Sequence, residues 1–142
     1  MAFREKMAWL TLVTMAVAYG AYFGWIGPAA GFGEARLIDL LRSFGPVAAA
    51  HALAMIVGAV LIALTARGEA RTPADERDRA IARRGRSIGY YVLIAGTILV
   101  GVVVPFSEPP WKIVNTALLA IVLAELVCQV VVLVSYRRGW HG

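Results

Sequence analysis

The stretch that decides the fold is residues 113–136, IVNTALLAIVLAELVCQVVVLVSY, in which Glu125 is the only charged side chain. A helix needs about 20 apolar residues to cross the ~30 Å hydrocarbon core of a bilayer. Three more stretches meet this requirement without any Lys, Arg, Asp or Glu: residues 7–27, 44–66 and 87–106. In lipid, unpaired backbone groups are so costly that only helices and closed barrels span a membrane. These runs lack the alternation of apolar and polar residues that is typical of barrel strands, so they are expected to be helices. The sequence therefore predicts an all-α membrane protein, a bundle of four transmembrane helices.

The composition agrees with this fold and excludes several classes of function. Of the 142 residues, 60% are hydrophobic and 16% are charged, whereas soluble domains are roughly 45–50% apolar and about 25% charged. We therefore expect a single membrane domain over residues 1–142. One cysteine excludes an internal disulfide and Cys-pair redox chemistry. No nucleophile with a base, metal cluster or phosphate loop is recognisable, so we expect a non-enzymatic protein without a cofactor.

The basic residues predict the orientation of the chain. Lys and Arg near span ends are retained on the cytoplasmic side of a membrane. Eleven of the 14 basic residues fall on one side of the four spans. The other side carries only Arg36, Arg42 and Lys112. Both termini are therefore predicted to be cytoplasmic, in a multi-pass protein of the plasma membrane.

Two connections on the outer side are short. Residues 34–43 place leucines at helical spacing, which predicts a short amphipathic helix lying at the outer membrane surface. Residues 107–110, Ser-Glu-Pro-Pro, predict a tight turn that makes the third and fourth spans antiparallel neighbours. Neither connection can form a folded external domain.

The cytoplasmic loop at residues 67–86 is the most charged part of the chain. Thr72 followed by Pro73 predicts a helix start, with Thr72 as the N-cap and Pro73 in the first helical position. The loop then offers a surface for anionic lipid headgroups or for a cytoplasmic or membrane protein partner. Its acidic first turn would repel phosphate, so nucleic acid is not an expected partner. The candidate surface comprises Asp75, Glu76, Arg77, Asp78, Arg79, Arg83, Arg84 and Arg86.

A second candidate site lies inside the bilayer. Glu125 is near the middle of the fourth span, and an acid at that depth persists only where it faces protein, water or a partner. Gln129 lies one turn away, Thr97 is at a similar depth in the third span, and His51 lies about a turn from the midplane. The side chains of this site could form hydrogen bonds between helices, or Glu125 could bind and release protons.

Small residues recur four positions apart in every span, as at Gly85 and Gly89, or Ala120, Ala124 and Cys128. This spacing lets helices approach closely in lipid. It is compatible with close packing inside one chain or with a homo-oligomer.

Two motifs resemble a known family. Residues 75–84 read DERDRAIARR and run into IGYY at 88–91, while YRRG follows at 136–139. This pattern resembles small four-span prokaryotic membrane proteins of unknown function, with an Asp-Glu-Arg motif before the third span. The resemblance implies a bacterial or archaeal membrane, and a role beside small transcription regulators. It carries over no catalytic residue.

Two functional hypotheses follow. The first is an accessory or regulatory subunit that docks a partner through its cytoplasmic charged loop. The alternative is a small proton-coupled transporter or channel subunit that uses Glu125. Small four-span multidrug exporters are similar in span count and in using an embedded glutamate, but they carry it in the first span, where this chain has none.

Overall fold

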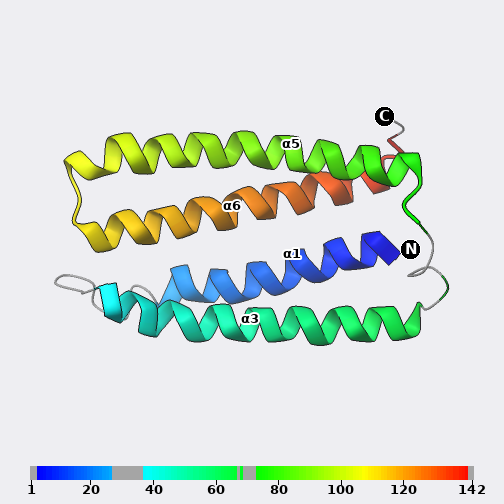
Figure 1. Cartoon of the computed structure of the whole chain (residues 1–142), viewed down its shortest axis with the longest axis horizontal. Coiled ribbons are helices and arrows are strands. Elements are labelled where there is room, and N and C mark those ends of the chain that lie inside the picture. The colour runs from blue at the N-terminus through cyan, green and yellow to red at the C-terminus, as the bar shows by residue number, and fades with distance from the viewer. Residues whose placement is uncertain (1–2, 27–36, 67, 69–72, 141–142) are drawn as a thin grey trace.

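The computed structural model describes residues 3–26, 37–66, 68 and 73–140, and this part of the chain is helical without strands (Figure 1). The elements are α1 (Phe3–Ala21), η1 (Tyr22–Ile26), α3 (Leu37–Thr65), α5 (Glu76–Ile98), η3 (Leu99–Val103), η4 (Val104–Phe106) and α6 (Pro110–Arg137). Four of the helical stretches are long and apolar enough to cross a membrane. The predicted all-α bundle, with four helices long and apolar enough to span a membrane, is therefore confirmed.

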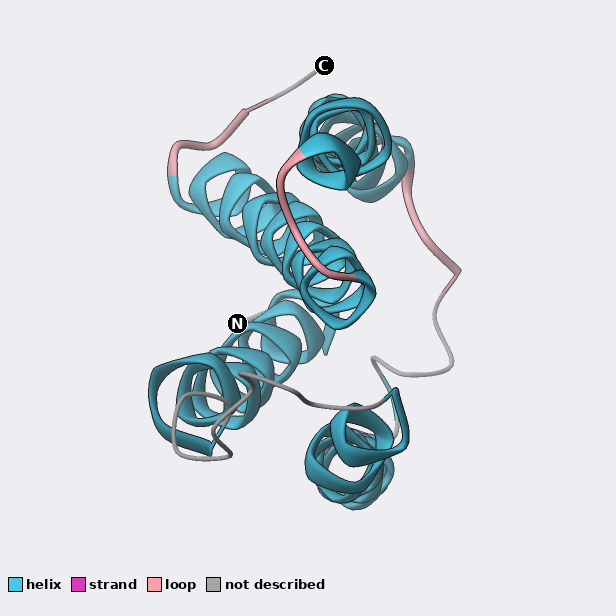
Figure 2. Ribbon diagram, turned by 90° about the vertical axis from the view of Figure 1, so that its left-hand side faces the viewer, coloured by secondary structure: helices cyan, strands magenta, loops and turns pink. Residues whose placement is uncertain are grey.

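The four long helices form two pairs. α5 packs along α6, α1 packs along α3, and α1 also contacts α6 and so joins the pairs. In the end-on view, the pairs meet along one side of the bundle and diverge on the other (Figure 2). The predicted tight turn after Phe106 does make the third and fourth spans antiparallel neighbours.

Glycines allow α5 to lie very close to α6. A Cβ atom added at Gly89 would lie 2.9 Å from the Ala124 carbonyl oxygen, and one at Gly96 would lie 2.7 Å from the Ala120 Cβ. A Cβ at Gly85 would meet Val132 and Cys128. The small residues of the third and fourth spans thus pack against each other within one chain, as packing in lipid requires.

The start of α3 differs from the sequence prediction. We expected a separate amphipathic helix over residues 34–43. Residues 34–36 lie outside the described part, and from Leu37 onward the chain is already the first turn of α3. Pro46 lies inside α3 without ending it, because membrane helices tolerate proline when neighbouring groups satisfy the freed carbonyl. Leu40 is buried in the protein, so this turn belongs to the bundle.

The start of α5 also differs. The helix begins at Glu76, so Pro73 precedes it, and Thr72 lies outside the described residues. The N-cap is Asp75, whose Oδ1 accepts a hydrogen bond from the Asp78 backbone N–H at 2.6 Å. The prediction of Thr72 as the cap was wrong because a charged carboxylate also interacts favourably with the helix dipole.

Candidate functional site

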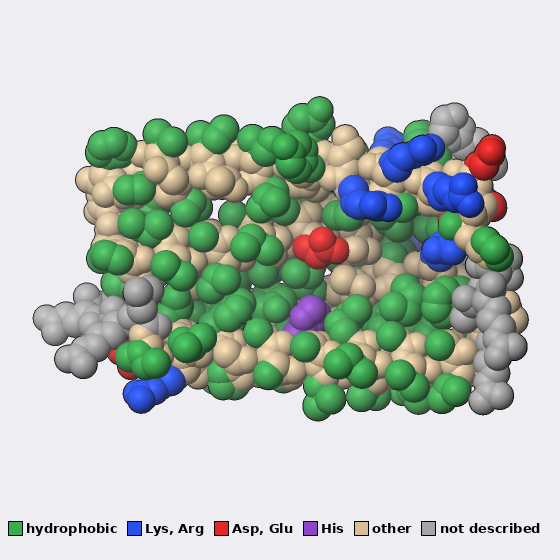
Figure 3. Space-filling view, in the orientation of Figure 1, with side chains coloured by type: hydrophobic (Ala, Val, Ile, Leu, Met, Phe, Trp, Pro, Cys, Tyr) green, Lys and Arg blue, Asp and Glu red, His purple; other side chains and the backbone are tan. Residues whose placement is uncertain are grey.

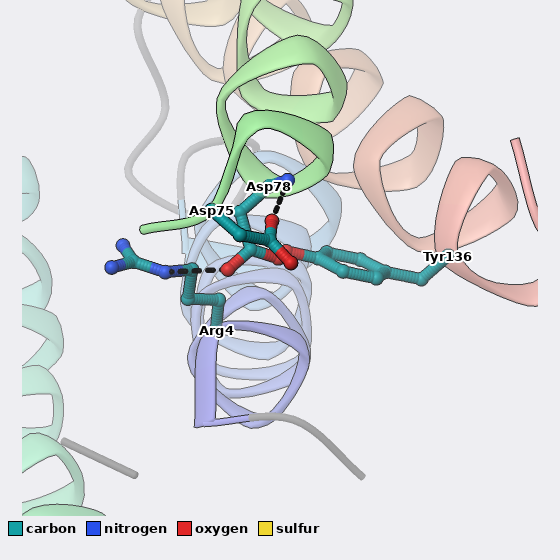
Figure 4. A network of polar contacts seen from close by, with 4 residues as sticks. All are labelled: Arg4, Asp75, Asp78 and Tyr136. Atoms are coloured by element: carbon teal, nitrogen blue, oxygen red, sulfur yellow. Dashed lines mark hydrogen bonds and ion pairs between the residues drawn. The ribbon is translucent and has the colours of Figure 1, made fainter. Parts of the chain in front are cut away.

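One end of the bundle, called here the basic end, comprises the first two turns of α1, the first three turns of α5, the last turn of α6 and the residues after α6 up to Trp140. Three of its side chains form a polar network (Figure 4). Asp78 Oδ2 lies 3.0 Å from Arg4 Nε, and Tyr136 donates its hydroxyl to Asp78 Oδ1 at 2.7 Å. Because these residues belong to α5, α1 and α6, the network ties three helix ends together.

The chain after α6 adds further contacts at the basic end. Arg77 Nε donates to the Trp140 carbonyl oxygen at 3.3 Å, and the Arg84 guanidinium lies 4.9 Å from the centre of the Trp140 ring. The Arg137 guanidinium lies 5.2 Å from the Trp9 ring. Such cation–π contacts contribute roughly 0.5–1 kcal/mol each at exposed sites. The basic end is therefore held together from all three helices.

These contacts divide the predicted charged surface into three groups. Asp75, Arg77 and Asp78 are engaged within the chain, as a helix cap and as partners of the residues above. Glu76 and Arg84 are exposed on the outer side of the end. The third group comprises Arg79, Arg83 and Arg86.

Arg79, Arg83 and Arg86 form a stripe along α5. Their spacing of four and three residues puts them on one helix face, and all three are exposed. Among the described residues, no carboxylate forms an ion pair with any of these three guanidinium groups, and none of them donates a side-chain hydrogen bond. They line a cavity of about 720 Å³ between α1, α5 and α6. Figure 3 shows basic side chains gathered over α5 at this end of an otherwise largely apolar face.

The same cavity reaches the predicted intramembrane site. Glu125, Cys128 and Gln129 line it together with the arginine stripe. Gln129 Nε2 donates to Glu125 Oε1 at 2.5 Å. The carboxyl of the fourth span thus has a hydrogen-bond partner on its own helix and faces a cavity that starts at the basic end.

The other two residues of the predicted intramembrane site have partners elsewhere. Thr97 donates to the Leu93 carbonyl oxygen of its own helix at 2.8 Å. His51 Nδ1 lies 3.5 Å from the Tyr19 hydroxyl, while His51 Nε2 is buried without a hydrogen-bond partner among the described residues. The structure therefore joins Glu125 to Gln129, and gives no hydrogen bond from Glu125 to Thr97 or His51.

The described residues hold no group of three or more His, Cys, Asp or Glu side chains that could bind a metal ion. No family model, curated protein or solved structure matches the chain. The resemblance to four-span prokaryotic proteins therefore stays a prediction.

Proposed function

We propose that this multi-pass membrane protein is a non-enzymatic accessory or regulatory subunit of a prokaryotic plasma membrane, and that a protein partner docks on its basic end in the cytoplasm. The observation that supports this most is the bracing of that end. Asp78, Arg4 and Tyr136 connect three helices, and Trp140 connects the last of them to Arg77 and Arg84. A braced end presents its remaining charges in fixed positions, which lowers the entropy cost of binding.

The outer side of the basic end is the docking surface in this proposal. Arg84 is exposed but held over the Trp140 ring, and Arg138 is exposed directly after the last residue of α6, between Tyr136 and Trp140 in the chain. A fixed guanidinium can pair with a carboxylate through two parallel hydrogen bonds. The partner surface expected here is therefore an acidic protein segment.

Substitution of Arg84 and Arg138 tests this proposal. We expect the double variant Arg84→Gln, Arg138→Gln to lose a partner that the unchanged protein recovers stoichiometrically from native membranes in mild detergent. The matched control is Arg42→Gln, Lys112→Gln, which removes two positive charges from exposed side chains at the opposite end. Asp75 and Asp78 are left unchanged because Asp75 caps α5 and Asp78 connects α5 to α1 and α6. Equal recovery from both variants, or recovery of the chain alone in every case, would contradict the docking proposal.

A second candidate function has its own supporting observation. The cavity at the basic end reaches Glu125, so a proton or cation could arrive there from one side of the membrane. For a small proton-coupled transporter or channel subunit, Glu125→Gln should abolish pH-driven flux in liposomes and leave expression unchanged. Glu108→Gln is the control, because Glu108 lies at the far end and pairs with Lys112 at 2.6 Å. Undiminished flux through Glu125→Gln would eliminate this function.

A further inference from the structure

We infer that the cavity at the basic end binds one phospholipid with an anionic headgroup, whose phosphate lies on Arg79, Arg83 and Arg86 and one of whose acyl chains follows α5 and α6 toward the opposite end. This inference goes beyond the proposed docking of a protein, because it uses a different set of side chains. It concerns the stripe of α5 that lines the cavity, whereas Arg84 and Arg138 do not line it.

The charge balance of the cavity supports an anionic headgroup. Its charged lining residues are Arg4, Asp78, Glu125 and the three arginines of the stripe. Asp78 is already paired with Arg4 and with the Tyr136 hydroxyl, and Glu125 accepts from Gln129 at the inner end. The stripe is thus left with three guanidinium groups that have no carboxylate partner among the described residues. Guanidinium groups bind phosphate oxygens through paired hydrogen bonds.

The apolar continuation of the cavity supports an acyl chain. A second cavity of about 330 Å³ shares Arg86, Glu125 and Cys128 with the first, and is otherwise lined by apolar or aromatic side chains and a glycine. A third of about 300 Å³ shares Leu93 and Ile121 with the second and extends to Thr97. From Arg86 to Thr97 a helix rises about 16 Å, close to the ~15 Å hydrocarbon depth of one leaflet.

The arginine stripe and the apolar cavities together indicate which class of ligand binds. A free phosphate would occupy the arginine stripe alone and leave the apolar cavities without contacts. An acidic peptide would have the same shortcoming, because its polar backbone groups cannot be satisfied along an apolar groove. A phospholipid supplies both the anion and the chain, and the stripe lies where the headgroup region would be if α5 crosses the membrane.

The experiment measures lipid retained by the full chain in a mild detergent, by native mass spectrometry and by the melting temperature with added lipid. The probes are dioleoyl phosphatidylglycerol and dioleoyl phosphatidylcholine, which share acyl chains and differ in net charge. We expect the unchanged protein to retain phosphatidylglycerol at a ratio of one and to show no comparable retention of phosphatidylcholine. Equal retention of the two lipids would overturn the inference, and this comparison needs no variant.

Variants then locate the site. Removal of about 1 kcal/mol of attraction per arginine predicts roughly a hundredfold weaker phosphatidylglycerol binding in Arg79→Gln, Arg83→Gln, Arg86→Gln. The control, Arg84→Gln, Arg137→Gln, Arg138→Gln, removes three arginines from the same end that do not line the cavity, and should bind as the unchanged protein does. Equal weakening in both triple variants would show diffuse attraction and overturn the site.

A final comparison tests the acyl chain. Dihexanoyl phosphatidylglycerol and glycerol phosphate should each bind more weakly than the dioleoyl lipid. Binding of glycerol phosphate as tight as that of the lipid would identify a soluble anion as the ligand and overturn the proposal. Because the docking proposal depends on Arg84 and Arg138, a failure of lipid binding leaves partner recovery unaffected, and the two failures are distinguishable.

Discussion

Gly89→Val is expected to force α5 away from α6 and to lower the melting temperature of the purified protein by several degrees more than Gly20→Val does. A Cβ atom at Gly89 would lie 2.9 Å from the Ala124 carbonyl oxygen and 3.0 Å from the Cys128 Cβ. The nearest of these atoms belongs to the backbone of a long helix, so it cannot move aside as a flexible side chain would. Overpacking of this kind costs about 1–3 kcal/mol, and valine adds two further methyl groups. The measurement is the melting temperature in detergent, with helicity followed by circular dichroism.

Gly20→Val is the matched control for this prediction. Gly20 also lies in a long helix, but a Cβ added there meets nothing within 4 Å. Its expected effect is small, because replacing an exposed helical glycine changes stability by about 1 kcal/mol or less. If Gly20→Val and Gly89→Val melt at the same temperature, the close approach of α5 to α6 is not what holds the pair together.

Much of the fold could be predicted from hydropathy alone. An apolar run such as residues 113–136 has no alternative to a membrane helix, since length and backbone hydrogen bonding leave no other solution. The turn at Pro109 and Pro110 likewise fixes an antiparallel neighbour. Helix ends were harder, because Asp75 and Thr72 both have side chains that can cap a helix, and spacing alone does not rank them. The continuity of α3 from Leu37 was missed because amphipathic spacing alone does not show whether the apolar face packs on protein or on lipid.

The candidate sites were predictable only in part. Gln129 was correctly placed beside Glu125, because residues four apart on one helix are always neighbours. The pairing of Asp78 with Arg4 and Tyr136 was missed, since it joins residues from three helices. A topological signal was available, because the predicted orientation puts the start of the first span and the end of the fourth on the same side as the loop. The position of the arginine stripe along the cavity depends on how α5 is rotated against α6, and the close contacts at Gly85, Gly89 and Gly96 fix that rotation.

The second prediction concerns the orientation of the chain in the membrane: the basic end should lie in the cytoplasm. The excess of arginine at the basic end should hold that end in the cytoplasm, and the docking proposal requires it to be there. Single cysteines at the two ends report this directly once Cys128, the one natural cysteine, is replaced. Glu76→Cys marks the basic end and Ser107→Cys marks the opposite end, and both positions are exposed. Neither change removes a basic residue, so neither should alter the orientation.

Labelling of these two variants, each made with Cys128→Ala, by a membrane-impermeant maleimide in intact cells tests the proposed orientation directly. With the basic end in the cytoplasm, Ser107→Cys should be labelled strongly before permeabilisation, and Glu76→Cys only after it. The variant with Cys128→Ala alone should stay unlabelled throughout and gives the background. Labelling of Glu76→Cys in intact cells, with Ser107→Cys protected, would rule out a basic end in the cytoplasm and with it the proposed docking of a cytoplasmic partner.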